Sequence, residues 1–188
     1  MCIDRQRIVD TVLSGLSEVP VSYLPAGHPL FEASLPTYPY DVAAAGQLLD
    51  QAGWIDHDQD PATPRQAWGV ATVLNGTPLE LTYLTTPAAQ RVQTATIVAD
   101  SLSACGVRVE VRYLEPQALY APGPDGHLFG RAFDLAQFAM GSGGSSPSCL
   151  WFTSSEVPTA ARYWVGTNLS GYNNPGFDAA CLALRQSL

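Results

Sequence analysis

The spacing of apolar positions along the chain predicts helices and strands that alternate through most of its length. The first helix is expected near the start, where the apolar residues between Ile8 and Leu13 recur at helical spacing. Asp4 suits the N-cap position, and Gly15 suits the left-handed conformation that ends a helix. Because the chain opens almost directly into this helix, we expect it to be part of a longer protein.

A second, short amphipathic helix is predicted from the stretch "YDVAAAGQLLDQAGW". Asp41 is expected to be its N-cap, and Gly53 is expected to end it. Trp54 is then expected to fold back as a core residue. The predicted apolar stripe of this helix consists of Val42, Ala45, Leu48, Leu49 and Ala52.

A strand, a long helix and another strand are predicted next. Residues 79–86 and 107–114 both show the two-residue alternation that is typical of strands. Between them, Thr86 is expected to cap a helix that has Pro87 at its first position and ends at Gly106. Short connections of this kind favour a parallel pair of strands with a right-handed crossover.

The rest of the chain is less regular. Residues 16–39 contain five prolines, which exclude a regular helix or central strand, and we expect this segment to lie over a surface. A third strand is predicted in residues 131–140, and residues 139–170 are expected to form an irregular region. A last helix is expected to begin at Asn174 or Pro175 and to continue to the final residue, as if the chain were cut there.

Composition limits the possible partners. The chain has 188 residues, of which 46% are hydrophobic and only 14% charged, so it is expected to be globular. Its net charge of -8 leaves no basic stripe for a phosphate backbone, so nucleic acid is not an expected partner. The sequence contains no apolar run long enough to span a membrane.

The cysteines are widely separated and form no CxxC pair, which argues against the common zinc and thioredoxin motifs. Disulfides remain possible, but buried free thiols are the favoured interpretation. Cys2 has no apolar leader before it, so we expect an interior cysteine here and not the lipidated residue of a lipoprotein. The four cysteines are Cys2, Cys105, Cys149 and Cys181.

An acidic turn offers the only motif typical of metal binding. Asp56, Asp58 and Asp60 have the spacing that begins an EF-hand loop. However, Pro61 stands where that loop needs glycine, and Ala67 stands where it needs a bidentate glutamate. A solvated acidic turn is the favoured interpretation, and we expect neither a metal nor a cofactor.

Catalytic motifs are weak. The chain has no GxSxG sequence, and "GSGGSS" lacks the ending of a phosphate-binding loop. An alternative function is nevertheless a hydrolase that uses Ser145, Ser146 or Cys149 as nucleophile and His127 as base. We favour a non-catalytic protein, in which His28, His57 and His127 are loop residues.

Aromatic and amide residues gather beyond the third predicted strand, where ligands tend to lie in open α/β sheets. Core packing is the commoner role of any one aromatic residue, so this is a hypothesis of a binding surface. The aromatic residues concerned are Trp151, Phe152, Trp164 and Tyr172.

Four stretches, in this order, resemble one protein family. They are "IDRQRIVDTVLSG", "YPYDVAAAGQLLDQAGW", "LELTYLT" with "VQTATIVADSLSACGVRVEVRYL", and "FDLAQFAM" with "NLSGYNNPGFDAACLAL". Together they are similar to the extracellular solute-binding proteins that include the oligopeptide, dipeptide and nickel receptors of ABC importers. The resemblance implies a periplasmic-binding-protein-like α/β lobe with a mixed, mainly parallel sheet flanked by helices. It also implies that residues 1–188 form a single lobe, mainly the second, of a longer two-lobe receptor.

The resemblance also implies a role for the Gly/Ser loop. Peptide-binding members of this family usually carry an acidic residue there, often before a proline, which pairs with the ligand's α-amino group. In this chain Ser145 or Ser146 stands at that place. A hydroxyl can accept a hydrogen bond but supplies no countercharge, so the usual ion pair is not expected.

The favoured function is therefore the substrate-binding component of an ABC importer, with no catalytic residue. It would capture a small solute, preferably a peptide, outside the cytoplasm and deliver it to a membrane permease. The full-length parent is expected to be periplasmic or a cell-surface lipoprotein. The residues expected to face the ligand are Met140, Ser142, Ser145, Ser146 and Trp151.

Overall fold

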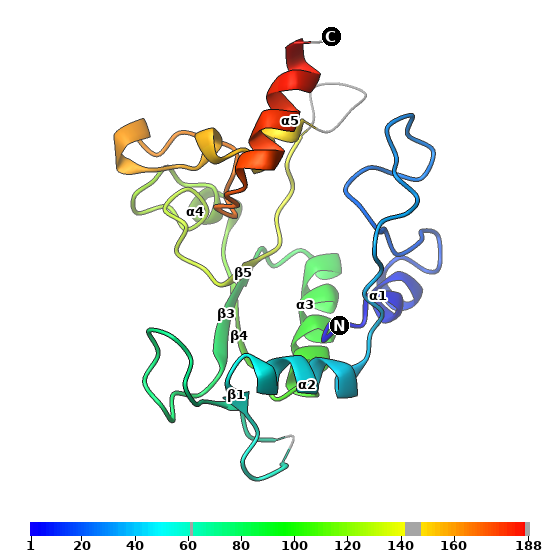
Figure 1. The fold of residues 1–188 in the computed structure, drawn as a ribbon, viewed down its shortest axis with the longest axis vertical. Coiled ribbons are helices and arrows are strands. Elements are labelled where there is room, and N and C mark those ends of the chain that lie inside the picture. Colours follow the sequence, from blue (N-terminus) through cyan, green and yellow to red (C-terminus); the bar gives the residue numbers. More distant parts are fainter. Residues whose placement is uncertain (61, 142–147, 187–188) are drawn as a thin grey trace. The chain divides into compact units, whose positions relative to one another are not determined.

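The structure is a computed structural model that describes residues 1–60, 62–141 and 148–186. The chain divides into two compact units, an N-terminal unit, Met1–Tyr113, and a C-terminal unit, Leu114–Leu188 (Figure 1). The single-lobe arrangement of residues 1–188 stays a prediction.

The N-terminal unit is built around a strand, a helix and a strand. Strands β3 and β4 are parallel, in a register that runs from Glu80 opposite Arg108 to Thr85 opposite Tyr113. Helix α3 connects them and packs against both (Figure 1). This arrangement confirms the predicted parallel pair and the α/β class. The elements of this unit are α1 (Arg5–Val12), α2 (Val42–Gln51), β1 (Trp54–Ile55), β2 (Gln66–Ala67), β3 (Glu80–Thr85), α3 (Ala89–Ser103) and β4 (Arg108–Tyr113).

The start of α3 differs from the prediction. The N-cap is Ala88 and no side chain caps the helix. The predicted cap, Thr86, is buried, and its hydroxyl accepts a hydrogen bond from the Arg91 guanidinium at 3.1 Å. The prediction of this cap was therefore wrong, because the hydroxyl faces Arg91 and does not face the first N–H groups of the helix. The end of the helix is as expected, since Gly106 has a φ of +76°.

The caps of the first two helices are confirmed. The Asp4 carboxylate accepts from the backbone N–H of Arg7, and the Asp41 carboxylate accepts from that of Ala44, each at 2.9 Å. The apolar stripe of α2 was partly wrong, because Leu48 is 55% exposed and Ala52 is exposed. The helix instead buries Ala45 and Gly46, while Val42 and Leu49 are half-buried.

The buried face of α2 packs on Arg65. A Cβ added to Gly46 would lie 3.0 Å from the Arg65 guanidinium, so a larger residue there would require this side chain to shift. The Arg65 side chain is 11% exposed and bonds to Asp50 Oδ1 at 2.6 Å and to the Trp54 and Cys105 carbonyls at 2.9 Å. It thereby joins α2 and the two-stranded β1–β2 sheet to the end of α3. The sequence pattern did not predict this small sheet, and Trp54 is half-buried in it and is not a core residue.

Cys2 and Cys105 form a disulfide across 103 residues, with their Cα atoms 6.0 Å apart. Cys149 and Cys181 form a second disulfide within the C-terminal unit. The favoured interpretation of buried free thiols was therefore wrong. The reason is that folding brings together cysteines whose sequence spacing shows no pairing.

The Pro-rich segment, residues 16–39, contains no helix or strand, as predicted. The Arg5 guanidinium donates to the Tyr38 carbonyl at 2.6 Å and to the Pro20 carbonyl at 3.4 Å, so it holds both ends of the segment near α1. Large apolar side chains along it are exposed, including Leu16 at 90% and Leu30 at 57%.

Tyr83 in β3 gives a test of this unit. The residue is 5% exposed, and its burial, together with the nearby Tyr113, raises the pKa of the phenol to about 12. Because the folded pKa lies above the ordinary value near 10, the folded unit holds this proton longer than the unfolded chain does. The free energy of unfolding should therefore fall between pH 10 and pH 12. In an alkaline titration followed at the tyrosinate absorbance, Tyr83→Phe should remove one late-titrating group; an unchanged late phase would contradict the assignment.

The C-terminal unit has little regular structure. Its elements are α4 (Pro116–Leu119), β5 (Leu135–Ala136), the short 3₁₀ helices η1 (Cys149–Phe152), η2 (Ser154–Glu156) and η3 (Ala160–Arg162), and α5 (Pro175–Gln186). The last helix begins where expected, because the Asn174 side chain accepts from the N–H groups of Gly176 and Phe177.

The strand predicted in residues 131–140 is much shorter in the structure. At its start, Arg131 has a φ of +55° and the Ala132 N–H bonds to the His127 carbonyl, so this part is a turn. At its end, the Tyr120 hydroxyl bonds to both the N–H and the carbonyl of Ala139 at 3.0 and 3.1 Å. Both backbone groups of Ala139 are thus occupied by a side chain, and only Leu135–Ala136 is strand.

Candidate functional site

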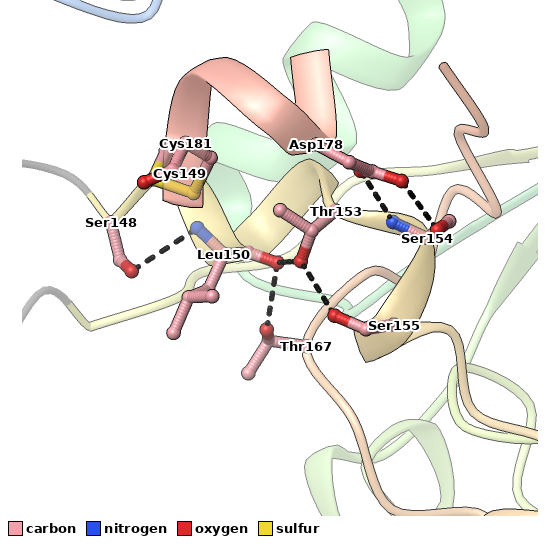
Figure 2. Close-up of a disulfide and its surroundings, with 9 residues drawn as sticks. All are labelled: Ser148, Cys149, Leu150, Thr153, Ser154, Ser155, Thr167, Asp178 and Cys181. Atoms are coloured by element: carbon pink, nitrogen blue, oxygen red, sulfur yellow. Dashed lines mark hydrogen bonds between the residues drawn. A yellow bond between two sulfur atoms is a disulfide. The ribbon is translucent and has the colours of Figure 1, made fainter. Parts of the chain in front are cut away.

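The candidate site lies in the C-terminal unit, where η1 and η2 pack beside α5 (Figure 2). The Cys149–Cys181 disulfide joins η1 to α5, with the two Cα atoms 5.7 Å apart. Ser148 caps η1 through its hydroxyl, which accepts from the Leu150 N–H at 3.3 Å. Short 3₁₀ helices have weak internal bonding, so this segment depends on contacts from outside for its shape.

A second attachment to α5 comes from Asp178. Its Oδ1 accepts from the Ser154 backbone N–H at 2.9 Å, and its Oδ2 accepts from the Ser154 hydroxyl (Figure 2). Asp178 is in the first turn of α5, where the helix dipole favours a negative charge. Asp178 and Cys181 are three residues apart, so both attachments lie on one face of the helix.

Hydroxyl groups bond around the Leu150 carbonyl. This oxygen accepts from Thr153 at 3.2 Å and from Thr167 at 3.4 Å, and the Ser155 hydroxyl approaches that of Thr153 at 3.4 Å (Figure 2). Thr153 is buried, whereas Ser155 is exposed. A cavity of about 210 Å³ adjoins this network and is lined by Leu150, Thr153, Ser155, Asp178, Leu182 and Arg185.

Asn168 holds the following loop to the same network. It is fully buried, and its amide nitrogen donates to the carbonyls of Thr153 at 2.9 Å and Tyr172 at 2.8 Å. Its side-chain oxygen accepts from the Ser170 hydroxyl at 2.9 Å and from the Tyr172 N–H at 3.2 Å. All of the amide's bonding capacity is thus used inside the unit, which gives Asn168 a structural role.

Aromatic residues pack at the start of α5. Phe177 makes edge-to-face contacts with Phe152, at a centroid distance of 6.3 Å, and with Tyr172, at 5.7 Å. Trp164 lies against the backbone, since a Cβ added to Gly123 would be 2.7 Å from the Trp164 Cβ. Phe152 and Trp164 are half-buried, so the choice between core packing and a binding surface stays open for both. Trp151 is half-buried in η1.

Residues 1–157 match the middle region of the bacterial extracellular solute-binding proteins, family 5. The chain belongs to this family. Among curated proteins, the Protein XP55 of Streptomyces lividans is 42% identical over 52 residues, which are 28% of this chain and 9% of that protein. The recognition made from the sequence motifs is thereby confirmed.

Solved structures show the same fold. The oligopeptide-binding protein of Thermus thermophilus, in complex with a pentapeptide, has a TM-score of 0.79 at 22% identity, covering 96% of this chain and 30% of that one. NikA of Brucella suis, in complex with Fe(III)-EDTA, has a TM-score of 0.71 at 22% identity, covering 97% of this chain and 34% of that one. These similarities confirm the periplasmic-binding-protein-like α/β class. The chain spans about a third of the length of both proteins.

The site residues predicted from the family resemblance are only partly described. Trp151 lies in η1 and Met140 is half-buried beyond β5. Ser142, Ser145 and Ser146 lie outside the described residues. That these five residues face a ligand therefore stays a prediction.

Cys149 does not support the alternative of a hydrolase with a cysteine nucleophile. The residue is in a disulfide, so it has no thiol with which to attack a substrate. The other proposed nucleophiles, Ser145 and Ser146, lie outside the described residues. His127 lies in a loop in which its backbone carbonyl accepts from Ala132. The known relatives of the chain are binding proteins.

The carboxylates of the acidic turn accept hydrogen bonds from backbone N–H groups of the same turn. Asp56 accepts from the Gln59 N–H at 2.8 Å, and Asp58 accepts from the Asp60 N–H at 3.1 Å and from the Thr63 hydroxyl. The bonds from the Asp60 N–H and the Thr63 hydroxyl lower the pKa of Asp58. Asp58 and Asp60 are exposed, as in the acidic turn predicted from the sequence, and the expectation that it binds no calcium stays a prediction. Within the described part of the chain, no three His, Cys, Asp or Glu side chains converge as metal ligands.

In the described residues, none of the helices combines the length and the apolar character needed to cross a bilayer.

Sequence reasoning missed three residues that organise the site, Asn168, Asp178 and Cys181. Asp178 could have been found as an acidic residue in the first turn of the predicted last helix. Its partner Ser154 is 24 residues away, however, and Thr153 is 15 residues from Asn168. Pairings at such separations have no signal in a single sequence.

Proposed function

We propose that this chain belongs to the substrate-binding component of an ABC importer. The component captures a small solute outside the cytoplasm and delivers it to a membrane permease. The observation that carries this proposal is the match of residues 1–157 to the solute-binding family. The chain spans about a third of the length of the compared structures, and we propose that the part of the binding site in this chain is enough to bind the solute.

A peptide is the proposed solute. The Thermus thermophilus relative was solved with a pentapeptide, whereas the Brucella suis relative was solved with a metal chelate. The surroundings of η1 support the peptide, because the exposed Ser155 and the half-buried Trp151 supply a hydroxyl and an aromatic side chain, which suit a peptide backbone and its apolar side chains. Ligand-facing residues are proposed to be Met140, Ser142, Ser145, Ser146 and Trp151.

An extracytoplasmic location is supported by the two disulfides of the chain itself. Disulfides persist in oxidising compartments and are rare in the cytosol. We place the full-length protein in a periplasm or at the cell surface as a lipoprotein.

The test is a peptide titration followed by NMR of the four tryptophan indole N–H groups. A pool of pentapeptides of mixed sequence should shift the Trp151 signal with a Kd of about 0.1 mM or tighter. Trp68, which is 61% exposed in the N-terminal unit, is the matched control and should not shift. Since no carboxylate is proposed to meet the peptide amino group, an N-acetylated pool should bind within about twofold.

The absence of any indole shift with both the pool and Ga(III)-EDTA, a diamagnetic equivalent of the iron chelate, would contradict this function. A Trp151 shift with Ga(III)-EDTA and none with peptides would contradict the peptide as the solute. A large loss of affinity on N-acetylation would contradict only the proposed role of the serines.

A further inference from the structure

We propose that the Cys149–Cys181 disulfide is a positioning element of the ligand site, which holds Trp151 in the place that solute binding requires. This inference rests on the proposed function. It assigns to the disulfide a role beyond stability, and the observations that support it all lie within the C-terminal unit.

Trp151 lies in the sequence between two attachments to one helix. On one side, two residues away, Cys149 is bonded to Cys181 of α5. On the other side, three residues away, Ser154 donates twice to Asp178 of the same helix. Both partners lie on one face of α5, so the short segment from Cys149 to Ser154 is held at its two ends (Figure 2).

Besides these two attachments, the segment is held by hydrogen bonds to the Leu150 and Thr153 carbonyls and by the contact of Phe152 with Phe177 of α5. It consists of η1, of four residues, and the start of η2, of three residues. Helices this short are not stable by themselves. The Leu150 carbonyl, in the peptide bond to Trp151, accepts from the hydroxyls of Thr153 and Thr167, and the Thr153 carbonyl accepts from the Asn168 amide. None of these bonds reaches α5, so the disulfide is what attaches the Cys149 end of the segment to that helix, and without it we expect Trp151 to sample more positions.

A restrained side chain binds more tightly because it loses little conformational entropy when the ligand binds. Without the disulfide, Trp151 would lose this entropy on binding, and the affinity would fall. The Cys2–Cys105 disulfide is a built-in comparison, since it has similar Cα geometry but lies in the N-terminal unit. Losing it should affect stability without affecting Trp151.

The experiment compares C149S/C181S with C2S/C105S in the pentapeptide titration of the whole chain. We expect C149S/C181S to bind about tenfold more weakly and to show a broadened Trp151 indole signal without ligand. C2S/C105S should bind within about twofold of the parent chain. A further variant, C149V/C181A, keeps apolar contacts at the buried Cys181 position while removing the tether, and it should match C149S/C181S.

Several outcomes would overturn the proposal. Unchanged affinity in both tether-free variants would show that Trp151 needs no such restraint. An equal loss in C2S/C105S would show a general effect of stability. Unfolding of both C149S/C181S and C149V/C181A would show that the disulfide acts only by stabilising the fold. If the parent chain itself gives no peptide-dependent shift, the proposed peptide binding fails, and the positioning role in peptide binding fails with it.

Discussion

Replacing Asn168 by alanine is expected to lower the free energy of unfolding of the C-terminal unit by about 3–4 kcal/mol. The side chain is fully buried and takes part in four hydrogen bonds. Alanine would remove all four bonds, although the Thr153 carbonyl would keep its bond from the Glu156 N–H and the Tyr172 N–H would keep its bond to the Ser170 hydroxyl. Because each lost bond contributes about 0.5–1.5 kcal/mol, the loss of four is a large effect for one side chain.

Urea unfolding followed by tryptophan fluorescence measures this effect, since Trp151 and Trp164 lie in the unit concerned. Asn173→Ala is the matched control, because Asn173 is exposed in the same loop and should change the free energy by less than about 0.5 kcal/mol. Equal effects of the two substitutions would show that Asn168 does not hold the loop.

Removing the Cys2–Cys105 disulfide is expected to destabilise the N-terminal unit by about 4–5 kcal/mol. The bond closes a loop of 103 residues, and the loss of chain entropy in the unfolded state grows with loop length. The Cys149–Cys181 bond closes a loop defined by a separation of 32 residues, so its removal should cost about 3–4 kcal/mol.

The urea midpoints of C2S/C105S and C149S/C181S, each compared with that of the parent chain, test whether the disulfide that closes the longer loop contributes more stability. Thiol titration of the unfolded, unreduced parent chain provides the control and should detect no free cysteine. Free thiols in that titration would contradict the pairing itself. A larger cost for the shorter loop would contradict the entropic explanation.

The sequence predicted local structure well where the cause was local. Asp4, Asp41 and Asn174 cap their helices through groups two to three residues away, so the pattern alone located them. The third strand failed because Tyr120, 19 residues earlier, occupies the backbone of Ala139. The stripe of α2 was partly wrong, and the helix packs on Arg65, which is 15 residues beyond Asp50 and gave no local signal.

In the candidate site, too, the sequence predicted local features and missed contacts between distant residues. Trp151 was predicted from its place after the third strand and from family resemblance, and it lies beside the network described above. Asn168, Asp178 and the Cys149–Cys181 bond were not predicted, because their partners are 15 to 32 residues away. Family resemblance indicated the region, whereas the contacts that shape it became visible only in the folded unit.

The central claim is that the chain binds a solute without transforming it. The most direct measurement places the chain and the pentapeptide pool in equilibrium dialysis and determines the peptide masses and concentrations on both sides of the membrane. We predict an excess of intact pentapeptides on the side of the protein and unchanged masses on both sides. Shortened peptides on either side, or no excess with the protein at concentrations above about 0.1 mM, would contradict the claim.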